Sequence, residues 1–203
     1  EGGVQRAYGV EAYANVIKRY ENNAEYKPIN AKASTQDGLN PSAVTFDELH
    51  AHKTHDLMNV LTSAEGARDN PVFLYTTTEG YETTGPWPEI RQFAQNILKG
   101  IVEADHFFAV YYSVDEEDKS EGIVADEDFD ESSYRKANPL YDYNYKLREK
   151  MGQLATEARI MAGKLGEFRT KRLNRRSASA NSWVDIREWN LCSEPFDPTD
   201  LVG

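Results

Sequence analysis

The sequence predicts an α/β protein in which a parallel sheet flanked by helices precedes a helical subdomain. In the first half of the chain, short apolar runs rich in β-branched residues alternate with amphipathic segments, the pattern of strands connected by helices in a parallel sheet. In the second half, apolar residues recur at spacings of three and four from Leu140 to Phe168, which is typical of helices. A chain of 203 residues has room for one domain with a small appendage.

The first 62 residues predict two helices separated by extended structure. Residues 10–20 carry apolar side chains at helical spacing, and residues 26–34 alternate as an extended segment does. Residues 43–46 form a short β-branched run after several turn-forming residues, which predicts a buried strand. Residues 49–62 return to helical spacing and predict the second helix.

The next elements are a second buried strand over residues 72–75 and a helix that begins near Pro86. Proline suits the first turn of a helix, where an N–H group would have no partner in any case. Residues 107–114 predict a third strand, and the acidic segment after it predicts a surface loop. Residues 139–168 predict one long helix, or two helices that meet near residues 163–166.

The composition excludes several classes of protein. The chain is 39% apolar and 28% charged, which suffices for a folded core and argues against disorder. No apolar run approaches the roughly 20 residues of a membrane helix, so we expect no membrane partner. The single cysteine, Cys192, cannot form an internal disulfide, and we expect a reducing cytoplasm. With a net charge of −11, any contact with nucleic acid must come from a local basic patch.

A candidate catalytic pair follows the first predicted strand, where Asp47 and Glu48 come directly after residues 43–46. The carboxyl end of such a strand faces the crevice in which open α/β sheets bind ligands. An aspartate there can hold Mg²⁺, and an adjacent glutamate can orient and deprotonate an attacking water. The same pattern also fits an ordinary helix N-terminus, where the helix dipole favours carboxylates.

Three threonines, Thr76, Thr77 and Thr78, end the second predicted strand. Parallel strands end at the same edge of a sheet, so we expect these hydroxyl groups close to Glu48. Such a cluster can sense the γ-phosphate of a nucleotide or relay its hydrolysis to a moving segment. Threonine is also common in strands for reasons of packing alone.

Four motifs together resemble those of the large terminase subunit of tailed double-stranded DNA bacteriophages, the ATP-driven motor that packs the genome into the procapsid. Residues 37–52 resemble the Walker B region of that family, and residues 66–80 resemble its coupling motif. Residues 134–139 resemble the segment that opens its linker region, and residues 168–174 the segment near its end. The four motifs follow the order of the family and span most of the chain.

The resemblance implies a partial P-loop-NTPase-like sheet, with ATP and Mg²⁺ as cofactors. Asp47 would be the magnesium ligand and Glu48 the catalytic base. The three threonines would couple the state of the nucleotide to the movement of DNA. Arg68 would stabilise transition-state charge, in cis or across a ring interface, although an ordinary surface arginine is an equal alternative.

The basic segment from Lys164 to Arg176 is the candidate DNA contact of such a motor. Arginines that contact phosphates hold DNA without reading its sequence. The alternative is that these cations pair with the acidic surplus of the protein itself, including residues 126–131. The candidate DNA-binding residues are Arg169, Lys171, Arg172, Arg175 and Arg176.

The sequence departs from the family in two respects. It contains no phosphate-binding loop with its lysine, and it contains no C-terminal nuclease domain, which we would expect to begin near residue 191. The interpretation is therefore the middle of a large terminase, with the second half of the ATPase domain in residues 1–115, a helical linker subdomain in 116–190 and a tail in 191–203. The implied partners are double-stranded DNA, the portal protein, the small terminase subunit and further copies of the chain in a ring.

Two other functions fit parts of the sequence. Asp47, Glu48 and His50 fit the Asp-Glu-x-His box of superfamily 2 helicases, which would make the chain part of a helicase-type translocase. A non-catalytic phage assembly module would keep the fold and bind other phage proteins. A histidine metal site is disfavoured, because only His52 and His55 have the spacing that two ligands on one helix need.

Overall fold

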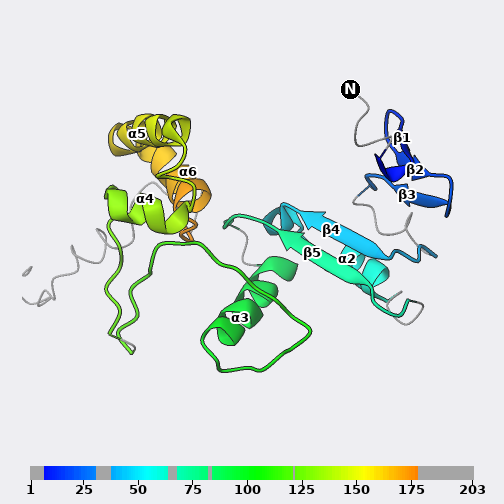
Figure 1. The fold of residues 1–203 in the computed structure, drawn as a ribbon. Helices are drawn as coiled ribbons and strands as arrows, with labels where there is room; N and C mark the ends of the chain where they lie inside the picture. Colours follow the sequence, from blue (N-terminus) through cyan, green and yellow to red (C-terminus); the bar gives the residue numbers. More distant parts are fainter. Residues whose placement is uncertain (1–6, 31–37, 64–67, 82–83, 121, 178–203) are drawn as a thin grey trace, which may run out of the picture. The chain divides into compact units, whose positions relative to one another are not determined.

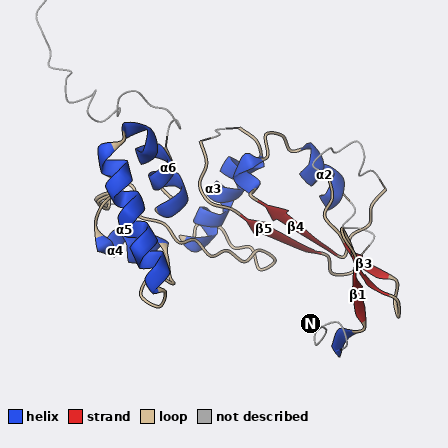
Figure 2. Cartoon of the chain, turned by 90° about the horizontal axis from the view of Figure 1, so that it is seen from above, coloured by secondary structure: helices blue, strands red, loops and turns tan. Residues whose placement is uncertain are grey.

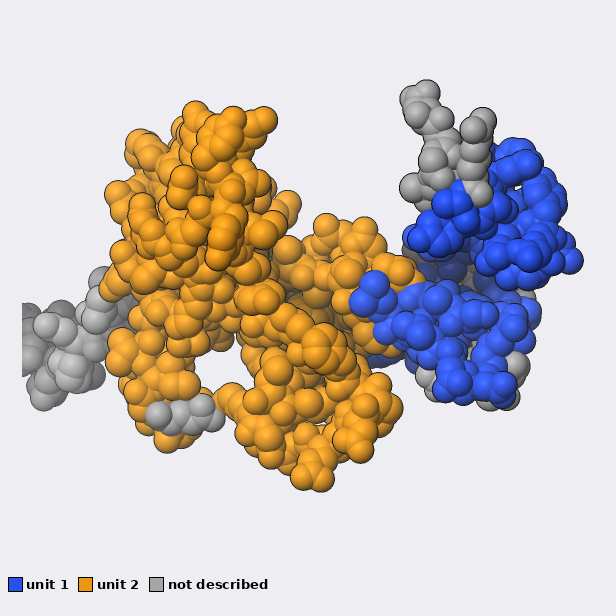
Figure 3. Space-filling view, in the orientation of Figure 1, with its two compact units in different colours: residues 1–44, 54–74 blue, residues 45–53, 75–203 orange. Residues whose placement is uncertain are grey.

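The protein has a mixed α/β fold in a computed structural model, with two small sheets and a set of helices (Figure 1, Figure 2). The chain divides into two compact units (Figure 3), the first made of residues 1–44 and 54–74, the second of residues 45–53 and 75–203. The residues that the structure describes are 7–30, 38–63, 68–81, 84–120 and 122–177. No helix within these described ranges is long and apolar enough to cross a membrane.

The first unit contains an antiparallel sheet where the sequence predicted a helix over residues 10–20, so that prediction is wrong. Strands β1 (Val10–Ala12), β2 (Ile17–Arg19) and β3 (Ala24–Tyr26) pair in chain order. The register sets Ala12 opposite Ile17, and Ile17 opposite Tyr26. Part of the extended segment predicted over residues 26–34 is therefore β3, and residues 31–37 lie outside the described residues.

The helical spacing of residues 10–20 was misleading because it does not describe a buried face. Tyr13, Ile17 and Tyr20 are all exposed. The hydroxyl groups of Tyr13, which follows β1, and Tyr20, which follows β2, meet at 2.6 Å. Lys18 and Glu25 stand opposite each other on β2 and β3 and form a 2.7 Å ion pair, the kind of cross-strand pair that stabilises sheets.

The second sheet pairs the two strands that the sequence predicted, β4 (Ala43–Asp47) and β5 (Val72–Thr76). At their beginnings the N–H of Val72 donates to the carbonyl of Ser42 at 3.0 Å, and at their ends the side chains of Thr76 and Asp47 meet. The beginnings of β4 and β5 are adjacent, and so are their ends, so the two strands run parallel. Exposure alternates along both strands, so one face is packed and the other, which carries Asp47 and Thr76, is exposed.

The helix predicted over residues 49–62 is interrupted. A short 3₁₀ turn, η2 (Leu49–Ala51), follows β4, and the helix proper, α2, begins only at Asp56 and ends at Thr62. Glu48 has a left-handed backbone with φ of 52°, and His52 returns to an extended conformation. These two residues bend the chain at both ends of η2, which prevents one continuous helix.

Helix α3 (Pro86–Leu98) confirms the prediction of a helix that starts at the prolines. Its N-cap is Gly85, whose φ of 84° is a conformation that glycine adopts without strain. A Cβ atom at this position would lie 2.3 Å from the carbonyl oxygen of His52, so only glycine fits.

Residues 107–114 are extended but do not pair as a strand within the described part of the chain, so the third predicted strand is wrong there. Phe107 packs edge-to-face on Phe93 of α3, with ring centroids 5.0 Å apart. Phe108 is 88% exposed. The N–H of Val114 donates to the carbonyl of Leu173 at 3.1 Å, which anchors this segment to the residue after the last helix.

The predicted helical region is confirmed, as two helices rather than one, with a shorter helix before them. Helices α4 (Glu131–Ala137), α5 (Tyr145–Ile160) and α6 (Ala162–Arg172) enclose the largest core of the second unit. α5 and α6 separate at Met161, whose extended backbone breaks the helix close to residues 163–166, where the sequence predicted that two helices would meet. The buried core residues are Val114, Tyr134, Ala137, Tyr141, Met151, Ala155, Ala158, Phe168 and Leu173.

Candidate functional site

The ends of β4 and β5 bring together Asp47 and Thr76, two of the predicted site residues. The hydroxyl of Thr76 donates a 2.8 Å hydrogen bond to Oδ1 of Asp47. The same oxygen accepts the backbone N–H of Glu48 at 3.1 Å. Behind them, Phe46 and Tyr75 stack with ring centroids 5.3 Å apart on the packed face. The stacked rings fix the two strands, and the carboxylate and the hydroxyl stand next to each other on the open face.

Glu48 leaves the strand in a left-handed conformation that is uncommon for residues other than glycine. Its side chain is 63% exposed and reaches Nδ1 of His50 at 3.2 Å. Asp47 and Glu48 are adjacent in the sequence, yet their carboxylates have different partners, a hydroxyl and an imidazole. The two acids can therefore serve different roles.

His50 is a site residue to which the sequence analysis gave no part in the phosphate chemistry. Its backbone N–H donates to the hydroxyl oxygen of Thr77, and its Nδ1 lies at 3.0 Å from the same oxygen. Thr77 uses its own hydroxyl proton to reach the carbonyl of Thr78 at 2.9 Å. The oxygen of Thr77 must then act as acceptor, which places a proton on Nδ1 of His50, where it also faces Glu48. The Asp-Glu-x-His spacing was the signal that pointed to this residue.

Gly80 holds the strand end against this histidine. A Cβ atom at position 80 would come within 2.9 Å of Cβ of His50 and 3.1 Å of its ring, so the backbone of Gly80 lies close to this side chain. Thr78 accepts the hydrogen bond from Thr77 with its carbonyl oxygen. Of the three predicted threonines, Thr76 therefore contacts the aspartate and Thr77 contacts the histidine.

The donor atoms at this site suit Mg²⁺. Asp47 and Thr76 offer a carboxylate and a hydroxyl oxygen, and hard divalent cations prefer oxygen ligands. Among the described residues no group of three or more His, Cys, Asp or Glu side chains could enclose a metal ion. Mg²⁺ in proteins usually keeps several waters and shares one or two protein ligands with substrate phosphates.

Arg68 lies in the first unit, whereas Asp47 and Glu48 belong to the second. Its guanidinium donates to the backbone carbonyl and the side-chain oxygen of Asn40, at 3.1 to 3.3 Å. Arg68 is exposed. The structure thus gives Arg68 a local partner, and its catalytic role stays a prediction.

The basic segment divides into two groups, and the first faces inward. Arg175 is 7% exposed, forms an ion pair with Asp128 and donates to the carbonyl of Asp126. Arg169 binds the other carboxylate oxygen of Asp128 at 2.7 Å. These two arginines are therefore internal ion-pair partners of the acidic loop, which is the alternative that the sequence left open.

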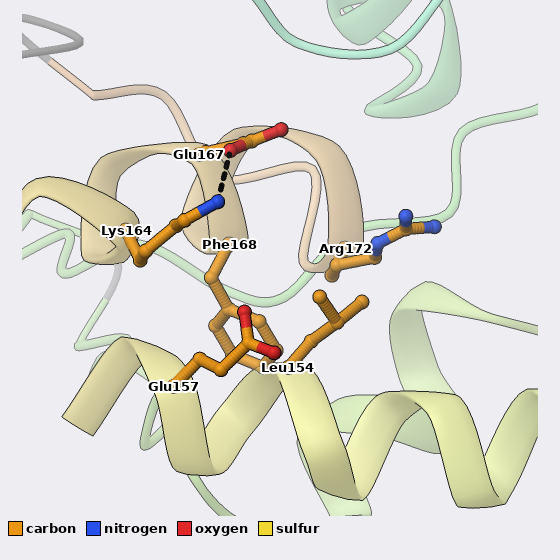
Figure 4. Close-up of a pocket in the computed structure, with 6 residues that line it drawn as sticks. All are labelled: Leu154, Glu157, Lys164, Glu167, Phe168 and Arg172. Carbon is orange, nitrogen blue, oxygen red and sulfur yellow. Dashed lines mark ion pairs between the residues drawn. The ribbon is translucent and has the colours of Figure 1, made fainter. Parts of the chain in front are cut away.

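The second group of basic residues, Lys171, Arg172 and Arg176, is exposed. Lys171 forms an exposed 3.5 Å ion pair with Glu167 one turn earlier. Arg172 lies at one end of a small open pocket between α5 and α6, with Lys164 at the other end (Figure 4). The pocket has a volume of about 70 Å³, too small for a nucleotide.

Comparison with known proteins identifies the family of the chain. A family model described as "Terminase large subunit, endonuclease domain" matches residues 101–203. The chain belongs to the terminase large subunit family. The match includes the whole of the region that we expected to be a linker, and it starts well before residue 191, where we expected nuclease sequence to begin. The boundaries predicted near residues 115 and 190 stay predictions.

Two curated proteins and one solved structure are similar to this chain. Protein YmfN of Escherichia coli (strain K12) is 29% identical over 167 residues, which cover 82% of this chain and 35% of YmfN. The terminase large subunit of Enterobacteria phage HK97 is 26% identical over 179 residues, covering 85% of this chain and 32% of that protein. The crystal structure of the HK97 bacteriophage large terminase has a TM-score of 0.64 at 22% identity and covers 91% of this chain and 36% of its own. The chain spans about a third of the length of these relatives.

Proposed function

We propose that the chain is part of an ATP-driven viral DNA-packaging motor, in which the ends of β4 and β5 form the hydrolytic half of the ATP site. The contact between Thr76 and Asp47 carries this proposal, because it joins the carboxylate proposed to hold the metal at the end of β4 to the end of β5. Membership of the terminase large subunit family supports a packaging role over a helicase-type translocase or a non-catalytic assembly module.

The proposed roles of the residues follow from their partners. Asp47, with its carboxylate beside a hydroxyl, would hold Mg²⁺, which when bound neutralises charge on the phosphates. Glu48 has an exposed carboxylate and would orient the attacking water and accept its proton. His50 faces Glu48 through a protonated Nδ1 and limits the directions in which that carboxylate can point. Thr77, bound to the same histidine, would report the state of Glu48 to the segment after β5.

The decisive experiment is Glu48→Gln in the gene product at its full genomic length. We expect kcat for Mg²⁺-ATP to fall by about 10²- to 10⁴-fold, the usual contribution of a general base, with nucleotide affinity little changed. Asp47→Ala should weaken Mg²⁺-dependent nucleotide binding as well. Glu131→Gln makes the same chemical change in an exposed ion pair on α4 and serves as control. A loss of less than about threefold for Glu48→Gln would assign the base to another residue.

DNA contact is proposed for the exposed basic residues Lys171, Arg172 and Arg176. Cations on an otherwise acidic surface would bind the phosphate backbone without regard to sequence. The portal protein, the small terminase subunit and further copies of the chain in a ring are proposed partners, in the cytoplasm of the host cell. Each is an expectation from the family.

The match of residues 101–203 to an endonuclease-domain model favours DNA cleavage as a second activity of the same protein. In the described part of that region, Asp115 and Asp126 both bind Lys136, and Asp128 binds two arginines. These acids are therefore engaged in ion pairs. Linearisation of a supercoiled plasmid by the purified chain with Mg²⁺ or Mn²⁺ tests whether the 203 residues cleave DNA by themselves.

A further inference from the structure

Glu79 is a buried carboxylate that the proposed hydrolysis does not use. It follows the three threonines directly in the sequence, and its side chain is only 2% exposed. A buried charge is costly unless it is paired and hydrogen-bonded, so each of its partners bears on why an acid occupies this position.

The carboxylate of Glu79 is bound by helix α3 and by the extended segment that follows this helix. Arg91 of α3 forms an ion pair with Oε1, and the hydroxyl of Tyr111 donates to the same oxygen at 2.7 Å. Trp87 of α3 approaches Oε2 with its indole N–H at 3.4 Å. Burial and the neighbouring charge of Glu79 raise the pKa of Tyr111 to about 12, so its phenol stays a donor at neutral pH.

The backbone of Glu79 is bound by a third part of the chain, Asn174, which lies two residues after α6. Its N–H donates to the side-chain oxygen of Asn174 at 3.1 Å, across 95 positions of sequence. Asn174 has a left-handed backbone, with φ of 50°, and its side-chain NH₂ donates to the carbonyl of Tyr112 at 2.8 Å. Through its side chain and its backbone, Glu79 thus joins the segment after β5 to α3, to residues 111–112 and to the residues that follow α6.

An apolar side chain would fill this position with less desolvation, since a buried ion pair seldom stabilises a fold more than a hydrophobic group of the same size. A charged pair instead fixes the relative orientation of its two partners, because its hydrogen bonds form only in one geometry. Thr77 and Gly80, which lie on either side of Glu79 in the sequence, are both held against His50. A movement of His50 can therefore reach, through Glu79, the region that matches the endonuclease-domain model.

We propose that Glu79 is a positioning residue that transmits changes at the threonine strand end to residues 107–114 and 173–177. The inference rests on the proposed ATP site, because a change of nucleotide state at Asp47 and Glu48 is the signal to be transmitted. Glu79 contacts neither nucleotide nor metal in this scheme and acts through Arg91, Tyr111 and Asn174.

The test uses the gene product at its full genomic length and measures amide hydrogen exchange with and without Mg²⁺ and a non-hydrolysable ATP analogue. In the wild type, we expect the nucleotide to alter exchange both at residues 45–50 and at residues 107–114 and 173–177. Glu79→Gln keeps the shape but removes the charge. It should keep the local response and lose most of the distant one, with kcat for ATP lowered about tenfold or more and KM within about twofold.

Two further variants complete the test. Glu131→Gln, in the exposed pair with Arg135, should leave both responses intact. Tyr111→Phe removes one hydroxyl donor and keeps the ion pair, so it should weaken the distant response even if Glu79→Gln does not fold. A distant response that survives in Glu79→Gln, or in Tyr111→Phe when the former is unfolded, overturns the inference. A wild type with no nucleotide response at residues 45–50 overturns the proposed ATP site itself, and the relay with it.

Discussion

Replacement of Arg175 by glutamine separates an internal ion pair from a DNA contact. Arg175 is buried, it pairs with Asp128, and it donates to the carbonyl oxygens of Asp115 and Asp126. Glutamine is too short to reach these partners and removes this ion pair from the buried carboxylate, which keeps its contact with Arg169. Arg172→Gln makes the same chemical change three positions earlier, on an exposed side chain, and is the matched control.

The magnitude follows from burial. Breaking a buried ion pair by removing one partner costs about 3–5 kcal/mol, and the remaining contact with Arg169 favours the lower end, about 3 kcal/mol. For a chain of this size, each kcal/mol lowers the melting temperature by roughly 2–4 °C, so Arg175→Gln should melt roughly 6–12 °C lower. Arg172→Gln should change stability by no more than about 0.5 kcal/mol.

The assays are thermal melting followed by circular dichroism, and anisotropy titrations of unrelated DNA duplexes over a series of salt concentrations. Arg172→Gln should weaken DNA binding for every duplex and reduce the slope of log affinity against log salt by about 0.9 for each phosphate that the variant no longer neutralises. Arg175→Gln should leave affinity and slope unchanged at temperatures where it is folded. The reasoning fails if Arg175→Gln melts within about 2 °C of the wild type, or if its DNA affinity falls as much as that of Arg172→Gln.

Three further predictions concern the helices, acid stability and nucleotide turnover. Asn144→Ala removes the N-cap of α5, which accepts two backbone N–H groups, and should cost about 1 kcal/mol of unfolding free energy by denaturant titration, with Asn144→Asp close to wild type. The pKa of Asp126 lies below its ordinary value. Burial by itself would raise this pKa, but the hydrogen bonds from Lys136 and from the N–H of Asp115 together lower it by more. The stability from Asp126 is therefore complete above its unfolded pKa of about 4 and is lost as the pH falls below that value, so melting of Asp126→Asn should depend less on pH from about 5 to 3 than melting of the wild type. The 203-residue chain by itself should bind ATP weakly and show no steady-state turnover, because its sequence holds no phosphate-binding loop; robust turnover that Glu48→Gln abolishes would contradict this.

Much of the site could be predicted because parallel strands end at one edge of a sheet. The β-branched runs before Asp47 and Thr76 identified two strands, and the side chains that follow them had to lie close together. The prolines at the start of α3 and the apolar spacing of α5 and α6 were equally local signals. All of these are statements about residues within one element or at its end.

The errors have a common physical origin. The apolar spacing in residues 10–20 is compatible with a helix and with a hairpin, and the exchange of hydrogen bonds between β1 and β2 decided between them. Residues 107–114 have the composition of a strand, but a strand also requires a partner. Among the described residues, none pairs with them as a strand.

The sequence by itself determined the acidic balance, the order of the motifs and the position of Asp47 and Glu48 after a strand. Only the tertiary structure decided which cations face inward, and it placed Arg175 on Asp128, 47 positions away. It also placed His50 between Glu48 and Thr77, and Glu79 against Asn174. Local propensity acts over a few residues, whereas the burial of a charge is decided by partners that the folded chain brings from far along the sequence.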